Sequence, residues 1–253
     1  MENFADLNQF IFDEIKEKIT KNKDYNEILS KKTFKNYNLV ITGSVGVGKS
    51  TVAEIISQLL NEKVVKFPEY INLKINNENI GLKMLKYKSE HLIGVDTFQH
   101  FILDSWNYIL QTRYDKKNDK IYLFERLPED AFRCFSVESY HNGEISYESL
   151  KCLEEKYTML IDKYNFFEMK DCKFIQIYND KLCKTVEEIL KIINNDIDNK
   201  VTHRLIGLNV DEEKFSERIK QRGRESEIKC IDIFKRYQNF YNKLYSNLDE
   251  NGY

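Results

Sequence analysis

The chain has 253 residues, of which 42% are hydrophobic and 13% are aromatic. This composition excludes a disordered chain and is sufficient for one domain with a substantial core. The 39 basic and 41 acidic side chains nearly cancel and the five cysteines are scattered, so we expect neither a broad nucleic-acid-binding surface nor a disulfide framework. Because the sequence shows no signal peptide and no membrane-spanning stretch, we expect a cytoplasmic protein without a membrane partner.

The first half of the chain shows helical and strand patterns in turn. Apolar residues at helical spacing from Phe4 to Ile19 predict an amphipathic helix, which belongs to an N-terminal helical extension over residues 1–34. The predicted elements that follow are a buried strand over 37–43, a helix over 49–60, a strand over 63–67, helices over 80–88 and 96–113, and a strand over 120–126.

The second half continues this alternation. The predicted elements are helices over 130–140 and 149–166, strands over 173–178 and 204–210, and a final helix over 227–248. The polar stretch 192–200 is predicted to be a surface loop. Strands that alternate with helices predict a parallel sheet covered by helices on both faces, which is a three-layer α/β/α fold.

A glycine-rich loop lies between the first predicted strand and the helix that follows it. It matches the P-loop pattern G-x-x-x-x-G-K-[ST] with Gly43, Ser44, Val45, Gly46, Val47, Gly48, Lys49 and Ser50. Glycines let backbone N–H groups turn inward around phosphate oxygens, and the helix adds the positive end of its dipole. We therefore expect this loop, with Thr51 beside it, to bind ATP, with Lys49 on the outer phosphates and Ser50 on Mg²⁺.

Downstream residues indicate what this nucleotide is used for. Glu69 follows the second strand at the sheet edge where ligands collect, and a carboxylate there can take a proton from a hydroxyl group. Gln99 lies on a predicted helix, and its amide can pair with a base edge. Glu125 and Arg126 end the third strand. Three arginines in one short stretch are typical of a lid that closes on phosphate charge: Arg218, Arg222 and Arg224.

In this order and at these spacings, the motifs resemble those of the deoxynucleoside kinase family, P-loop enzymes that move the γ-phosphate of ATP onto a nucleoside 5′-hydroxyl. The motifs are the glycine loop, Pro68-Glu69, Phe98-Gln99, Glu125-Arg126 and the R-x-x-x-R-G-R run over 218–224. The resemblance spans roughly residues 37–248. It implies a mainly five-stranded parallel sheet, a kinase domain over 35–253 with a helical lid at about 216–228, and a homodimer.

The resemblance also implies roles for single residues. Glu69 is implied as the general base, Gln99 as the partner of the base, Arg126 as the residue that holds Glu69 and the phosphate region, and Glu125 as a residue near Mg²⁺. Further residues are implied around the phosphates and the sugar: Arg222 and Arg224 on the transferring phosphoryl group, Arg218 on the ATP side, and Glu227 with Tyr87 on the 3′-hydroxyl.

Departures from the family pattern lie beside the expected substrate. Leu127 stands where the family has serine, and Tyr70 stands where it has a second proline. Trp106 and Ala131 occupy positions where relatives that favour deoxycytidine or purines carry an arginine and an aspartate, although Asp130 is one residue away. Because thymidine-accepting relatives have apolar residues at both positions, we expect a pyrimidine deoxynucleoside substrate, with thymidine first.

The order of elements near the end of the chain also differs from the family. The family places its last strand after the lid, whereas here the strand and helix over 172–194 precede it. We predict that residues 173–178 form the edge strand of the five-stranded sheet and that contacts to adenine follow Asn179. Two other functions stay open: a thymidylate-type monophosphate kinase, with Arg113 or Arg133 on the acceptor phosphate, and a nucleotide-binding module without catalysis.

Overall fold

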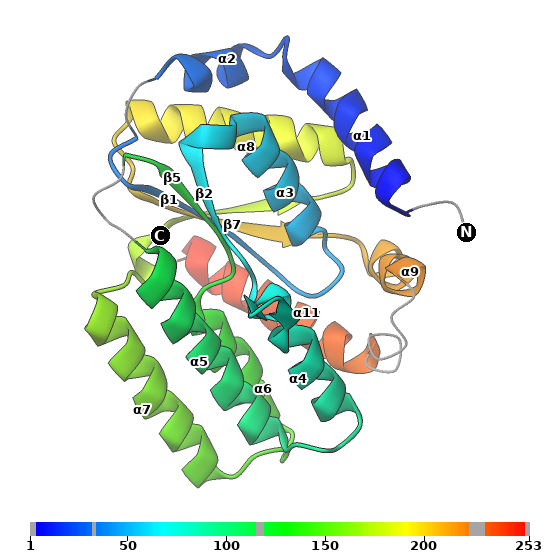
Figure 1. Ribbon diagram of the computed structural model, residues 1–253, viewed down its shortest axis with the longest axis vertical. Coiled ribbons are helices and arrows are strands. Elements are labelled where there is room, and N and C mark those ends of the chain that lie inside the picture. Colours follow the sequence, from blue (N-terminus) through cyan, green and yellow to red (C-terminus); the bar gives the residue numbers. More distant parts are fainter. Residues whose placement is uncertain (1–3, 32–33, 115–118, 223–230, 251–253) are drawn as a thin grey trace.

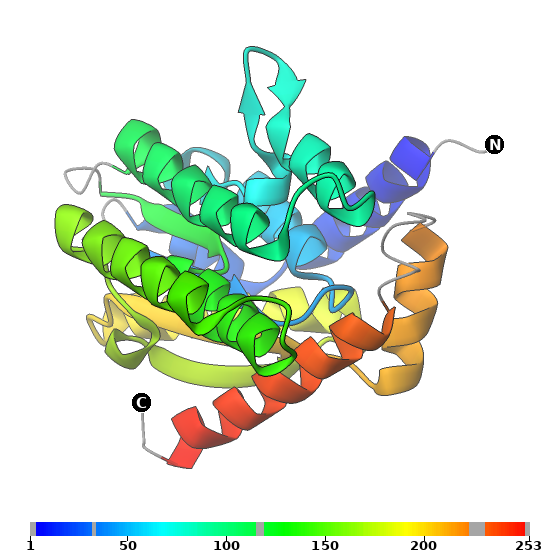
Figure 2. The same ribbon diagram turned by 90° about the horizontal axis from the view of Figure 1, so that it is seen from below.

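The protein is described by a computed structural model over residues 4–31, 34–114, 119–222 and 231–250. At its centre lies a parallel sheet with the strand order β2-β5-β1-β7-β6 (Figure 1). The strands are β1 (Tyr37–Thr42), β2 (Val64–Phe67), β5 (Ile121–Glu125), β6 (Lys173–Tyr178) and β7 (His203–Asn209). The predicted five-stranded parallel sheet is therefore confirmed. A separate antiparallel hairpin, β3 (Lys74–Ile75) and β4 (Glu78–Asn79), projects from the body of the molecule (Figure 2).

Helices cover both faces of the sheet, so the predicted three-layer fold is confirmed (Figure 1). The first face carries α3 (Lys49–Leu60) and α8 (Leu182–Asp198), with α1 (Phe4–Ile19) and α2 (Lys23–Ser30) packed against them. The second face carries α5 (Val95–Arg113), a π-helical segment (Asp130–Ser136) that continues into α6 (Val137–His141), then α7 (Tyr147–Tyr164) and α11 (Ile231–Glu250). Two further helices, α4 (Ile80–Ser89) and α9 (Glu212–Arg222), follow the β3–β4 hairpin and β7, respectively.

The buried strands are apolar on both sides because each side faces a helical layer. In β1, Leu39 and Ile41 pack with α3 and α8, whereas Val40 packs with the helices of the second face. In β5, Leu123 and Phe124 divide between the two faces in the same way. This alternation follows from the pleat of a strand, and it explains why the sequence shows continuous apolar runs.

The prediction of a surface loop over 192–200 is wrong, because α8 continues to Asp198. Ile193 is fully buried against the first face of the sheet. Asp196 accepts hydrogen bonds from the Tyr37 hydroxyl, at 2.9 Å, and from Arg204 Nε, at 2.7 Å. These tertiary contacts outweigh the low helix propensity of asparagine and aspartate in this stretch.

The prediction that residues 173–178 form an edge strand is confirmed. β6 pairs in parallel with β7, and β7 separates it from β1. The chain then returns after α9 as the long helix α11, which packs beneath β6, where the Phe174 and Tyr245 rings stack at 5.1 Å (Figure 2). In the described residues, no helix is long and apolar enough to span a lipid bilayer.

Candidate functional site

The glycine-rich loop joins β1 to α3, and its backbone conformation requires glycine. Gly43, Gly46 and Gly48 have φ values of 136°, 88° and 95°. A Cβ atom on Gly48 would lie 2.5 Å from Asn179 Nδ2. The helix begins at Lys49, as predicted, and the buried Lys49 Nζ donates to the Ser44 carbonyl oxygen at 2.7 Å. A loop that wraps around the first turn of a helix is an anion site, so this geometry suits the phosphates of a nucleotide.

The turn after β6 and helix α9 both donate hydrogen bonds to this loop. Asn179 follows the edge strand β6, and its Nδ2 donates to the Val47 carbonyl oxygen at 2.8 Å. Arg218 of α9 donates to the same carbonyl oxygen from Nη1 and to the Asn179 carbonyl oxygen from Nη2, at 3.2 and 2.8 Å. The structure therefore brings the turn after β6 and Arg218 to the glycine-rich loop. The position of Asn179 directly after a strand was the signal in the sequence for its contact with the loop.

Glu69 and Arg126 meet because they end neighbouring parallel strands. Glu69 follows β2, Arg126 follows β5, and both side chains are buried. Arg126 Nη1 donates to Glu69 Oε1, and Nη2 donates to the Gly43 carbonyl oxygen at 3.1 Å. Burial alone would lower the pKa of Arg126, but the Glu69 carboxylate and other nearby groups raise it overall. A permanently charged guanidinium thus links a carboxylate to the first glycine of the P-loop.

Asp130 holds the turn that carries Arg126. Arg126 is a non-glycine residue with a φ of 70°, and the next N–H group, that of Leu127, donates to Asp130 Oδ2 at 2.6 Å. Oδ1 accepts from the Thr42 hydroxyl at 2.5 Å and from the Tyr241 hydroxyl at 2.7 Å. With three donors on its carboxylate, Asp130 is committed to the turn rather than to a substrate. Sequence reasoning missed this role, although an acidic side chain three residues after the first residue of a helical turn can accept from the N–H group of that first residue.

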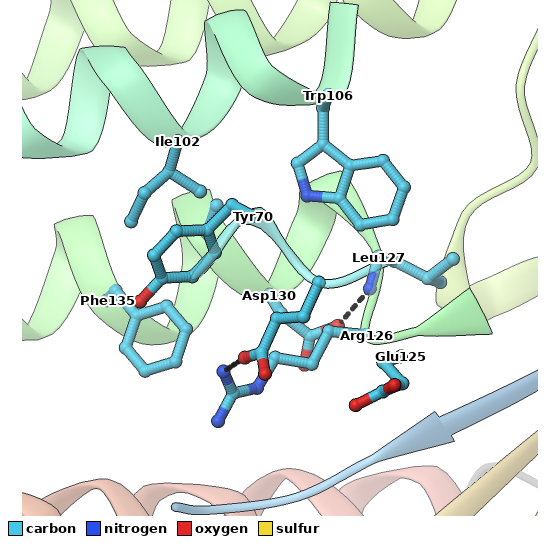
Figure 3. A pocket seen from close by; sticks show the side chains of 10 residues that line it. Tyr70, Ile102, Trp106, Glu125, Arg126, Leu127, Asp130 and Phe135 are labelled. Atoms are coloured by element: carbon cyan, nitrogen blue, oxygen red, sulfur yellow. Dashed lines mark hydrogen bonds and ion pairs between the residues drawn. The ribbon is translucent and has the colours of Figure 1, made fainter. Parts of the chain in front are cut away.

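A pocket opens above the Glu69–Arg126 pair (Figure 3). Trp106 and Ile102 of α5 line it, together with Leu127 and Ala131. Figure 3 also shows Tyr70 and Phe135 in its wall. The predicted residues Trp106 and Ala131 therefore lie together with Glu69 and Arg126. The wall is mostly apolar, and its charged groups lie at one end.

Gln99 lies on the same face of α5, one turn before Ile102 and two turns before Trp106. Its side chain is 2% exposed, and its Oε1 accepts no hydrogen bond from the described residues. A buried amide oxygen without a donor is costly, so the geometry is suited to a ligand that supplies one.

Glu125 and Ser50 are the residues whose side chains could hold a magnesium ion. The Glu125 side chain is 1% exposed at the end of β5, and its Oε1 forms an ion pair with Lys66 Nζ at 3.3 Å. Ser50 lies in the first turn of α3, beside the phosphate-binding loop. A carboxylate and a hydroxyl oxygen beside phosphates are the ligands that Mg²⁺ prefers.

Other predicted residues lie elsewhere or outside the described residues. Tyr87 is half-buried on α4 and is not among the described residues that line the pocket. Arg222 is the last residue of α9, and its side chain lies outside the described part, as do Arg224 and Glu227. Thr51 is exposed in the first turn of α3.

The two arginines considered for an acceptor phosphate are not part of the described pocket wall. Arg113 ends α5, and Arg133 Nε pairs with Glu129 Oε1 at 2.7 Å. The described pocket therefore offers no second cation for a monophosphate beyond Arg126.

Comparisons with known proteins bear on the family and the fold. A sequence model of the family described as deoxynucleoside kinase matches residues 39–200. The chain is similar to the structure of deoxyadenosine kinase from M. mycoides with bound dATP, at 18% identity over 83% of this chain and 84% of that chain, with a TM-score of 0.52. It is also similar to EHV4-TK complexed with TP5A, at 13% identity over 77% of this chain and 56% of that chain, with a TM-score of 0.42. No curated protein sequence matches the chain.

Proposed function

Because the chain belongs to the deoxynucleoside kinase family, we propose that it transfers the γ-phosphoryl group of ATP to the 5′-hydroxyl of a deoxynucleoside. The products are the 5′-monophosphate and ADP. The observation that carries this proposal is the Glu69–Arg126 pair, which lies between an apolar pocket and the P-loop. A hydroxyl group bound beside Glu69 would therefore lie close to a phosphate bound in the loop, with the Glu69–Arg126 pair between them.

Each residue then has a chemical task. Glu69 accepts the proton of the 5′-hydroxyl, and Arg126 orients Glu69 and places positive charge beside the loop. Lys49 exchanges the Ser44 carbonyl oxygen for phosphate oxygens, and Arg218 lies on the nucleotide side. Ser50 and Glu125 would hold Mg²⁺, which would neutralise charge on the phosphates. We assign Arg222 and Arg224 to the lid and Glu227 with Tyr87 to the sugar on the basis of the family motifs.

ADP release tests the reaction directly. Purified protein is incubated with Mg·ATP and each deoxynucleoside or its monophosphate, beside a Glu69→Gln variant. Turnover of a nucleoside that falls at least a hundredfold in the variant supports both the reaction and the base. Turnover of monophosphates alone would support a monophosphate kinase, and ATP binding without any turnover would support a non-catalytic module.

We propose a pyrimidine deoxynucleoside, thymidine first, as the substrate. The support is the apolar wall at Trp106 and Ala131, together with the three hydrogen bonds that Asp130, the carboxylate next to Ala131, already accepts. Gln99 Oε1 accepts no hydrogen bond from the described residues and could accept one from a base N–H group. The similar structure from M. mycoides is a deoxyadenosine kinase, so deoxyadenosine is the competing substrate in the panel. Turnover of deoxyadenosine with inert thymidine would refute this assignment.

We also propose that the enzyme is a cytoplasmic homodimer that acts in nucleotide salvage. Large apolar side chains are exposed on the second helical layer, with Met159 of α7 at 71% and Tyr108 of α5 at 41%. The described cysteines are free thiols, which suits a reducing compartment. Light scattering during size-exclusion chromatography would give the mass, and a monomer at micromolar concentration would contradict the dimer.

A further inference from the structure

A lysine ammonium group lies beside the carboxylate assigned to Mg²⁺. Lys66 Nζ is 3.3 Å from Glu125 Oε1 and 2.8 Å from Glu54 Oε2. The Glu125 side chain is 1% exposed, whereas that of Glu54 is 53% exposed. Lys66 therefore joins a buried carboxylate to one that contacts solvent.

The fold brings these three side chains to one place. Lys66 in β2 is in register with Leu123 of β5, and Glu125 lies two residues further along β5, on the same face of the sheet. Glu54 lies one helical turn after Ser50 on α3, so both are on the same side of the P-loop helix. The ammonium group thus lies between the strand and the helix that supply the two magnesium ligands.

We propose that Lys66 is a positioning residue that balances the charge of Glu125 in the metal-free enzyme and keeps only its ion pair with Glu54 when Mg²⁺ enters with the nucleotide. The inference rests on the proposed function, because it requires a divalent cation at Ser50 and Glu125. A buried carboxylate without a counter-ion is costly, so Lys66 stabilises the empty site. Two cations at one carboxylate repel each other, so Lys66 lowers the affinity for the metal.

This competition predicts opposite effects for the two partners of the ion-pair network. Lys66→Met leaves Glu125 without its cation, and we expect divalent affinity to rise about tenfold, which corresponds to about 1.4 kcal/mol. Glu54→Gln removes the group that keeps its ion pair with the ammonium, and we expect affinity to fall about threefold to tenfold. Lys66→Arg keeps the charge at this position and is expected to stay near the wild type.

The double variant separates this mechanism from long-range charge. If Glu54 acts through Lys66, Glu54→Gln has no effect in a Lys66→Met background. If Glu54 only attracts the metal through its negative charge, it weakens affinity in both backgrounds. The two explanations thus predict different effects of Glu54→Gln on divalent affinity in the Lys66→Met background, and a general loss of stability would not produce this difference.

The experiment is an electron paramagnetic resonance titration of Mn²⁺ against the full chain saturated with ADP, with Mn²⁺ on free ADP measured without protein. No nucleoside is present, so the readout does not depend on turnover. Tighter binding in Lys66→Met with wild-type-like binding in Lys66→Arg supports the inference. Unchanged or weaker binding in Lys66→Met, or a Glu54→Gln effect that persists in the double variant, overturns it.

Two further results remain distinguishable. Lack of ADP-dependent Mn²⁺ binding in the wild type would overturn the proposed function and this inference with it, whereas normal wild-type binding with unaltered variants overturns the inference alone. If Lys66→Met does not fold, Lys66→Gln, which also removes the positive charge, replaces it alone and in the double variant, and the same outcomes support or overturn the inference.

Discussion

Asp130 is fully buried and accepts three hydrogen bonds, and its removal is expected to cost both stability and activity. Asp130→Ala leaves three donors without their acceptor: the Thr42 hydroxyl, the Tyr241 hydroxyl and the Leu127 N–H group. A buried polar group that loses its partner costs about 1–3 kcal/mol. Because hydroxyl groups can rotate toward other acceptors and a backbone N–H group cannot, we expect a total near the low end, about 3–5 kcal/mol.

This loss is large compared with the whole free energy of unfolding of a domain, which is about 5–15 kcal/mol. Activity is expected to fall as well, since the Leu127 N–H bond holds the left-handed turn at Arg126. Urea unfolding measures the first effect, and the kcat of the folded fraction measures the second. Thr42→Val is the matched control, because it removes one donor and keeps the shape, and we expect a loss of about 1 kcal/mol.

A loss below 1 kcal/mol for Asp130→Ala, with unchanged kcat, would refute the assignment of Asp130 as the anchor of this turn. A large loss of stability with normal kcat in the folded fraction would refute only the coupling to Arg126.

Three further predictions concern the loop, the pocket and pH. Gly48→Ala places a Cβ atom 2.5 Å from Asn179 Nδ2 at a φ of 95°, so calorimetry should show ATP binding weakened at least tenfold; wild-type affinity would contradict the loop geometry. Trp106→Arg with Ala131→Asp should lower the kcat/KM ratio of thymidine to deoxycytidine at least tenfold, and an unchanged ratio would exclude this wall from base selection. Burial raises the pKa of Asp130 above 3.8, so its ionisation lowers the free energy of unfolding as pH rises from that value through the raised pKa. In urea unfolding from pH 4 to 8, Asp130→Asn should therefore reduce the change of the free energy of unfolding with pH, and an unchanged pH dependence would contradict the prediction.

Local backbone chemistry was enough to predict the parts of this protein that depend on neighbours in the chain. The strand, loop and helix around the P-loop were located from the sequence, and the helix starts at Lys49 as expected. Glycine conformations and helix starts depend on a few adjacent residues, so a short window contains the information. The same holds for the strand over 173–178, whose apolar run is local, whereas its edge position was expected from the family resemblance.

Prediction from the sequence was wrong where contacts with distant residues determine the local structure. Residues 192–198 are helical because Ile193 is buried and Asp196 binds Tyr37 and Arg204, and none of these partners is visible in the asparagine-rich stretch itself. Helix propensity is a weak preference that tertiary packing overrides.

Side-chain partners across the site depended on the order of the strands. The position of Glu69 and Arg126 at strand ends was readable, but their contact exists because β2 and β5 are neighbours. The bonds of Asp130 to Thr42 and Tyr241 span 88 and 111 residues, and the ion pair of Lys66 with Glu125 joins two strands. Sequence spacing carries no distance information over such separations, so only the folded sheet and its helical layers determine which charged groups meet.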